Sequence, residues 1–187
     1  MFSLRTKNKY KDITPEIYQN IIERSRSKFF YLNLDINDDF ESRFDIIILH
    51  SFIIFYFLKS SSESNKELSQ LLFDYMFNDF DNNLREMGFG DIAVNKKMKV
   101  FITAFYGRIT NYSQGVDQIK KNASDEMLNN AILNNIYKGK KLDSFYLKFF
   151  KEYIMRNLSF FNSRNIETNI NERFKFIEFP TEVENER

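Results

Sequence analysis

The stretch FDIIILHSFIIFYFL, residues 44–58, is the most apolar run of the chain, and Asp45 and the pair His50–Ser51 interrupt it. It falls short of the ~20 apolar residues that a bilayer-spanning helix needs. Asp38 or Asp39 can cap a helix that carries this run to Lys59. We therefore predict a buried core helix here, not a membrane anchor.

The composition around this run points to a helical protein. The 187 residues include 22 Phe and 10 Tyr but only two Pro and five Gly, which leaves few residues for β-hairpin turns. We predict an all-α fold, a single compact domain of five to six helices with an irregular C-terminal strap. The absence of cysteine excludes disulfides and thiolate chemistry, and a net charge of +1 gives no global argument for nucleic acid.

Helical spacing of apolar residues places the other helices. The first is expected to start at Thr14, as N-cap, with Pro15 in its first turn, and to reach the aromatic pair Phe29–Phe30. Later helices are expected over residues 64–87, from an Asp91 or Asn95 cap through Tyr112, over 125–137 and over 142–161. The expected organisation is a flexible basic arm at 1–13, a helical domain at 14–162, and a strap with an acidic tail at 163–187.

Two of these helices have clear opposite faces. The core stripe of the third helix is expected at Leu68, Leu72, Met76, Phe80, Leu84 and Met87, and that of the fourth at Met98, Ile102, Phe105, Ile109 and Tyr112. The opposite stripe of the fourth helix holds Lys96, Lys99, Thr103, Tyr106 and Thr110. This second stripe should face solvent or a partner.

The candidates for catalysis and metal binding are weak. His50 is the only histidine, so it has no second histidine with which to form a common catalytic or metal site, and we expect a hydrogen-bonded core residue. Asp74, Asp79 and Asp81 lack the Glu-x-x-His motif of ferritin-like sites. We therefore expect no metal, no cofactor and no enzymatic activity.

The junction LREMGFGDIAVNKKMKVFITAFYGR, residues 84–108, contains more glycines, charged residues and aromatic residues than a simple turn requires. Gly88 can end one helix in the left-handed region, and Gly90 permits a second unusual backbone angle before the next helix begins. The stretch from Arg85 to Arg108 contains five basic residues and only two acidic ones. The sequence therefore predicts a tight, locally basic corner.

Two interpretations of this corner remain open at the sequence level. It can be a well-capped helical hairpin whose basic helix is simply solvated. Alternatively, Tyr106 among the lysines, with Gly107 beside it in mid-helix, can form a face that contacts a partner. A second layer of core could also include both residues.

These segments resemble a known family. The junction with the preceding QLLFDYMFNDFDNN, the stretch RFDIIILHSFIIF and the earlier RSRSKFFY are similar to the ubiquinol-cytochrome c chaperone family, from about Thr14 to Tyr153. The matching positions are Arg43, His50, Asp74, Asp79, Asp81, Arg85, Glu86, Gly88, Gly90, Asp91, Lys97, Tyr106, Gly107 and Arg108.

The resemblance implies an all-α, non-catalytic assembly factor that binds newly synthesised cytochrome b for assembly of ubiquinol-cytochrome c reductase (complex III). Its implied partners are nascent or newly inserted cytochrome b, the ribosome, a small partner assembly factor and a membrane surface without a transmembrane segment. We expect a cytoplasmic bacterial protein, peripheral at the inner face of the inner membrane, or one on the matrix side if eukaryotic. The alternative is a ribosome- or RNA-binding module without direct client binding.

Roles are expected for two groups of residues. The partner-binding group is Arg85, Glu86, Gly88, Gly90, Asp91, Lys96, Lys97, Tyr106 and Arg108. The group that supports the fold is Arg43, His50, Asp74, Asp79, Asp81 and Gly107.

Overall fold

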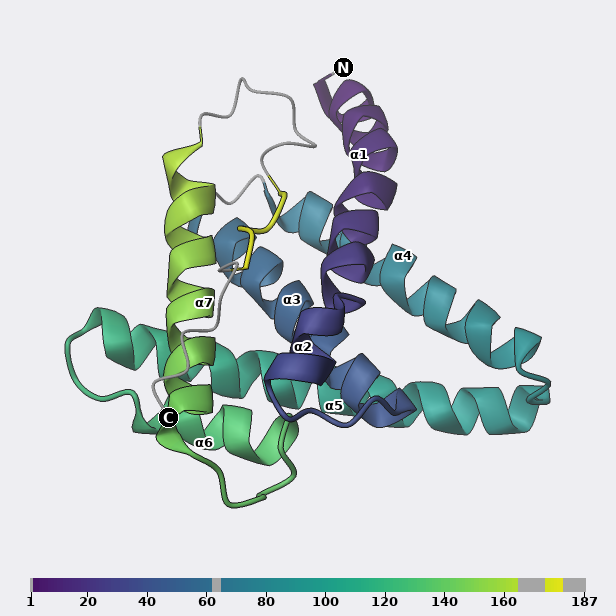
Figure 1. Cartoon of the computed structure of the whole chain (residues 1–187). Coiled ribbons are helices and arrows are strands. Elements are labelled where there is room, and N and C mark those ends of the chain that lie inside the picture. Colours follow the sequence, from purple (N-terminus) through teal and green to yellow (C-terminus); the bar gives the residue numbers. More distant parts are fainter. Residues whose placement is uncertain (1, 62–64, 165–173, 180–187) are drawn as a thin grey trace.

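The computed structural model of the protein describes residues 2–61, 65–164 and 174–179, and its described residues form helices and no strands. The helices are α1 (Phe2–Ser25), α2 (Lys28–Asn33), α3 (Phe40–Ser61), α4 (Asn65–Glu86), α5 (Asp91–Lys120), α6 (Glu126–Asn135) and α7 (Ser144–Ser163). They pack as a single domain (Figure 1). The all-α prediction is therefore confirmed.

Helix α3 lies at the centre of the fold. It contacts α1, α4, α5 and α7, and Leu49 and Phe52 in its middle are fully buried. At its start, the Asp39 carboxylate accepts a hydrogen bond from the backbone N–H of Ser42 at 2.8 Å, which lowers the pKa of Asp39 and caps the helix. The predicted buried core helix is confirmed. None of the described helices is long and apolar enough to cross a bilayer.

The first predicted helix is divided differently in the structure. Helix α1 runs from Phe2 to Ser25 with Pro15 inside it, so the helix start expected at Thr14 is wrong. The Thr14 hydroxyl donates to the carbonyl of Tyr10, one turn back, at 2.6 Å instead of capping the residues ahead. Helix α2 begins anew at Lys28, where Ser27 accepts from the N–H of Phe29. Flexibility of residues 1–13 stays a prediction.

Helices α4 and α5 form a hairpin whose corner stands at the edge of the molecule, away from α7 (Figure 1). Gly88 has a φ of +87°, its N–H donates to the Arg85 carbonyl, and the N–H of Phe89 donates to the Leu84 carbonyl. This pair of bonds is the Schellman ending of a helix, as Gly88 predicts. Gly90 has an ordinary φ of −73° and is itself the N-cap of α5, so the unusual angle expected there and the caps expected at Asp91 or Asn95 are wrong.

Helix α6 packs closely on α5 and α7. A Cβ at Gly115 of α5 would lie 2.7 Å from the Cα of Leu128, so only glycine permits this approach. Helix α7 adds the fully buried rings of Phe150 and Phe161 to the core, and Asp143 caps it by accepting from the N–H of Phe145. The helices expected over 125–137 and 142–161 are confirmed within a few residues.

The described part of the C-terminal strap, residues 174–179, has no helix or strand and packs across α1 and α7. The N–H of Ile177 donates to the Asn157 side chain at 3.0 Å, and Arg24 donates to the carbonyl of Phe176 at 3.1 Å. Phe179 stacks on Phe29 with ring centres 4.3 Å apart. Residues 174–179 are irregular, as predicted for the strap, whereas residues 165–173 and the acidic tail lie outside the described residues.

Candidate functional site

His50 is a structural residue of the core. Its side chain is fully buried, with Nδ1 2.8 Å from the carbonyl of Ile46 and Nε2 3.0 Å from the hydroxyl of Tyr153. Burial lowers the pKa of His50 to about 3, so the imidazole is neutral at physiological pH. The prediction of a hydrogen-bonded core histidine is confirmed.

The three predicted aspartates of α4 act separately. Asp79 accepts a hydrogen bond from the Tyr18 hydroxyl at 2.8 Å, which joins α4 to α1, while Asp74 accepts from Gln70 at 2.8 Å on the surface. Asp81 pairs with Arg85. Within the residues that the structure describes, no cluster of three His, Cys, Asp or Glu side chains is placed to hold a metal ion. The geometry supports structural roles for these carboxylates.

Arg85 holds the corner between α4 and α5 together. Its guanidinium donates to the carboxylates of Asp81 and Asp91, one on each side of the turn. These hydrogen bonds raise the pKa of Arg85, with Asp81 contributing most. Glu86, in the last turn of α4, is exposed. Arg85 and Asp91, both expected to bind a partner, are thus engaged with each other in the free protein.

The lysines and Tyr106 of α5 differ in their surroundings. Lys97 lies over the ring of Phe89, with Nζ 4.7 Å from its centre, and so braces the corner. Lys96 is exposed. Tyr106 is 55% exposed, and its ring centre lies 5.5 Å from that of Phe73 on α4. Tyr106 is therefore neither a core residue nor a fully free one.

Arg108 faces the interior, unlike the other residues of the predicted binding group. It pairs with Asp45 of α3 at 2.6 Å, and the Asp45 side chain is 1% exposed. Lys138, between α6 and α7, pairs with the other oxygen of Asp45. Burial raises the pKa of Asp45, while the two cations oppose that shift. The geometry supports an interhelical ion pair for Arg108, in place of the partner contact expected from the sequence.

A pocket of about 200 Å³ lies beside the corner, between α1, α3, α4 and α5. Its apolar lining consists of Ile22, Phe40, Phe44, Ile47, Phe80, Leu84, Met87 and Phe101. Two of these residues stand at its edge, Phe40 at 53% and Met87 at 60% exposed. The expected core position of Met87 is wrong, because α4 ends at Glu86 and the chain turns outward there. The pocket thus has a buried apolar floor and two exposed apolar lips.

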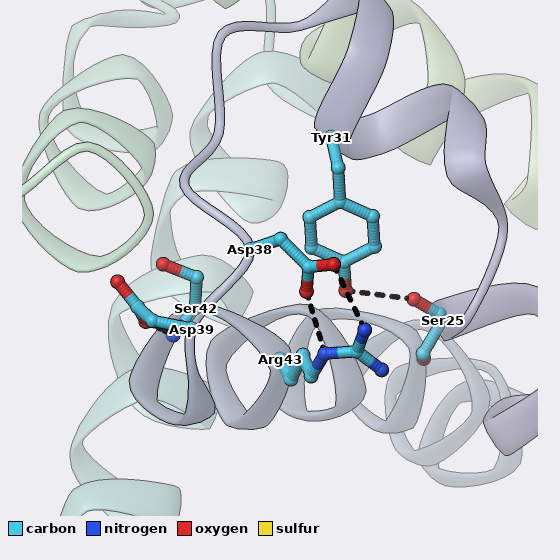
Figure 2. Close-up of polar contacts among 6 residues, drawn as sticks. All are labelled: Ser25, Tyr31, Asp38, Asp39, Ser42 and Arg43. Atoms are coloured by element: carbon cyan, nitrogen blue, oxygen red, sulfur yellow. Dashed lines mark hydrogen bonds and ion pairs between the residues drawn. The ribbon is translucent and has the colours of Figure 1, made fainter.

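Arg43 forms one wall of this pocket. Its guanidinium makes a two-pronged contact with Asp38, at 2.6 and 2.9 Å, and lies 5.5 Å from the centre of the Tyr31 ring. Tyr31 in turn donates to the carbonyl of Ser25 at 3.0 Å (Figure 2). These contacts fasten the chain between α2 and α3 to the end of α1. Arg43 therefore positions the wall beside Phe40.

Comparison with known proteins then identifies the family. The sequence profile described as "Ubiquinol-cytochrome C chaperone" matches residues 32–176. The chain belongs to the ubiquinol-cytochrome c chaperone family. That matched region includes α3, α4, α5 and the corner, together with most of the pocket lining.

Relatives of this chaperone family member are known in animals, fungi and bacteria. The chain is 25% identical over 162 residues to ubiquinol-cytochrome c reductase complex assembly factor 1 of Homo sapiens, covering 87% of this chain and 52% of that protein. It is 27% identical over 163 residues to the mitochondrial protein CBP3 of Saccharomyces cerevisiae, covering 84% and 47%. The chain spans about half the length of these curated relatives.

A solved structure shares the fold along almost the whole chain. The crystal structure of the Cbp3 homolog from Brucella abortus superposes with a TM-score of 0.73 at 25% identity, covering 94% of each chain. The two chains therefore share one fold over nearly their whole length.

In this chaperone family member, the corner and the pocket form one candidate site. Leu84 and Met87 belong to both, because the end of α4 makes one side of the pocket and the start of the turn. Sequence reasoning found the corner and Arg43 but missed the lips Phe40 and Met87. Phe40 gave a faint signal, as an aromatic residue directly after the acidic cap. An apolar cavity with exposed apolar lips can receive large apolar side chains from a partner.

Proposed function

We propose that this protein is a non-catalytic assembly factor for ubiquinol-cytochrome c reductase that binds newly synthesised cytochrome b. Family membership and the names of the relatives, ubiquinol-cytochrome c reductase complex assembly factor 1 and CBP3, support the assembly role. The pocket beside the corner, with its exposed lips, is the observation that supports direct client binding. Cytochrome b is a membrane protein, so its membrane-spanning segments carry apolar surface that has no partner subunit before assembly.

The pocket suits transient binding of such a segment. Phe40 and Met87 are half exposed in the free protein, and a bound client side chain would cover them. Complete burial of a large apolar side chain stabilises a complex by about 1.5–3 kcal/mol, so covering these half-exposed residues gains less than that for each. The polar rim, which includes Arg43 and Asp79, already has partners within the chain. Binding would therefore gain mainly from apolar contact, without leaving buried charges unpaired. Such a modest gain also allows the client to be released.

The test is purification of the tagged protein from its native cell, followed by identification of the proteins that copurify. We expect cytochrome b with the wild type and at least a tenfold lower recovery with Met87→Glu, because a buried charge is strongly disfavoured. Leu32→Glu is the matched control, since Leu32 is 78% exposed on α2 and does not line the pocket. Absence of cytochrome b from the wild type, or equal losses with both variants, would contradict the proposal.

The ribosome- or RNA-binding alternative predicts a different result. Ribosomal components alone would copurify, and affinity would fall steeply with salt, with a slope of about −0.7 per phosphate contact on single strands. Apolar client binding depends far less on salt. Repeating the purification at two salt concentrations therefore distinguishes the two functions.

A further inference from the structure

Helix α5 carries a continuous exposed face that the candidate pocket does not use. We call it the outer face of α5, and its residues are Ile92, Lys96, Lys99, Val100, Thr103, Tyr106 and Thr110, all exposed. Their spacing of three and four residues places them on one side of the helix. Helices α3, α4 and α6 pack against α5, and within the outer face the ring of Tyr106 also contacts Phe73 of α4. Helix α5 begins at the corner, at the edge of the molecule (Figure 1).

The charge of this face has one sign. Between Asp91 and Asp117 the helix has no acidic residue in 25 positions, while it carries Lys96, Lys97, Lys99 and Arg108. Arg108 is paired inward with Asp45, and Lys97 is turned to Phe89. Lys96 and Lys99 remain outward, and among the described residues no ion pair joins either of them to a carboxylate. The outer face is therefore locally cationic in a chain of nearly zero net charge.

The same face exposes large apolar side chains before and after its lysines. Ile92 is 87% exposed and Val100 is 60% exposed, and Tyr106 is 55% exposed farther along the helix. Aliphatic residues, a tyrosine, hydroxyl groups and lysines on one helix side match the interface of a bilayer. There the apolar tips enter the acyl boundary, tyrosine lies at the level of the headgroups, and lysines attract anionic lipids.

We propose that the outer face of α5 docks on an anionic lipid surface. A nucleic-acid backbone would match Lys96 and Lys99 but would leave the exposed aliphatic side chains of Ile92 and Val100 without a function, because it binds through phosphate contacts and base stacking. Ile92 and Met87 flank the same corner, so docking would also bring the pocket lip close to the bilayer. This inference does not depend on the proposed function, because it concerns lipid alone.

The experiment is flotation of the purified full chain with vesicles of phosphatidylcholine containing about 30% phosphatidylglycerol, against vesicles of phosphatidylcholine only. We expect the wild type to float with the anionic vesicles. The double variant Lys96→Gln/Lys99→Gln should bind about 25-fold more weakly, about fivefold for each lysine. The double variant Ile92→Ser/Val100→Ser should lose about tenfold through its lost apolar contact.

Matched controls use equally exposed residues elsewhere. Leu32→Ser removes an exposed apolar side chain from α2, and Lys141→Gln/Lys148→Gln removes two exposed lysines that lie outside α5. Both controls should retain binding within about twofold, since these residues lie off the docking face. Circular dichroism should show unchanged helix content for every variant, because all positions are exposed.

Two results would overturn the inference. One is a wild-type protein that floats with neither kind of vesicle. The other is a loss with the lysine variant while the Ile92→Ser/Val100→Ser variant binds as well as the wild type, together with binding of a single-stranded RNA probe. That pattern would assign the face to phosphate contacts alone. Neither result bears on client capture, since no client is present in the vesicle assay.

Discussion

The strap end and the corner end of the molecule differ in how far their large apolar side chains are buried. At the strap end, the rings of His50, Tyr153 and Phe176 pack edge to face, and each is nearly or fully buried. At the corner end, Phe40, Met87 and Ile92 stand in solvent. The strap covers the first region from within the chain. The chain thus covers its own apolar surface at the strap end and leaves that of the corner exposed, as the proposed client binding requires.

Charged residues show the same contrast. Asp45 is buried and shared by Arg108 and Lys138, so its ion pairs join three distant segments in a region of low dielectric. Arg85 makes its two ion pairs at the exposed corner, where water screens them. The buried pairs should therefore hold the fold, while the exposed pairs should mainly shape the turn.

The largest effect expected from removing a polar contact is at the buried ion pair. Asp45→Ala should lower the free energy of unfolding by about 3 kcal/mol, because it leaves the guanidinium of Arg108 mostly buried without its carboxylate. Urea unfolding measures the change. Asp81→Ala, which removes one of the two carboxylates beside Arg85, is the control and should have a much smaller effect. Equal losses would show that the corner depends on its ion pairs as strongly as the core does.

A second prediction uses pH to probe the strap end. His50 has a folded pKa of about 3 and an unfolded value near 6.5, so only the unfolded chain gains a proton between these values. Stability is fully present above about pH 6.5 and is lost as pH falls toward the folded pKa. We expect a loss of about 2 kcal/mol by about pH 5.

The measurement is urea unfolding at a series of pH values with wild type and His50→Gln. Since His50 is the only histidine, the variant should show little change between about pH 6.5 and pH 5. A wild-type curve that is equally flat would mean that His50 is accessible to protons in the folded state.

A third effect, of about the same size as the second, is expected within the corner itself. Gly88→Val should cost about 2 kcal/mol, because a β-branched residue is strained at a φ of +87°. Gly90→Ala is the matched control, since Gly90 has a φ of −73° and nothing lies within 4 Å of its added Cβ. Thermal unfolding should show a clearly lower midpoint for the first and a smaller decrease for the second, because alanine is a poorer N-cap than glycine. Similar midpoints for both would contradict the assigned left-handed ending.

The smallest effect is expected on the outer face of α5. Tyr106→Ala should cost about 1 kcal/mol, the value of one aromatic contact, here with Phe73. Phe105→Ala, one residue away but 2% exposed, should cost about 3–5 kcal/mol. Urea unfolding of both variants compares the two sides of the helix. Equal costs would show that Tyr106 belongs to the core, and would weaken its role on a docking face.

Sequence reasoning succeeded where the signal is local. The apolar run predicted α3, and apolar residues spaced by three and four predicted α4 and α5. Gly88 predicted a left-handed helix ending. These signals are reliable because helical periodicity and a positive φ depend on residues close together in the chain. It failed at Thr14, whose hydroxyl can cap the residues ahead or bond to a carbonyl behind. That choice depends on whether the preceding residues are helical, which the residues around Thr14 do not specify.

The candidate site was only partly predictable for a related reason. The spacing of Lys96, Lys99 and Tyr106 correctly indicated a side of α5 that faces outward. Arg108 is also a basic residue of α5, but it lies on the side of the helix that packs against α3. Which flank of a helix is covered depends on how neighbouring helices cross it, and one helix's own sequence does not specify that crossing.

The helical class, the burial of α3, the glycine ending at the corner and the resemblance to the family could all be predicted, because each follows from residue types at short, fixed spacings. The folded structure was needed to show that Asp45 pairs with Arg108 and Lys138, and that Met87 and Phe40 line the same pocket. These contacts join residues far apart in the chain. They arise from the packing angles of helices and the paths of the turns, which set the positions of whole elements relative to one another.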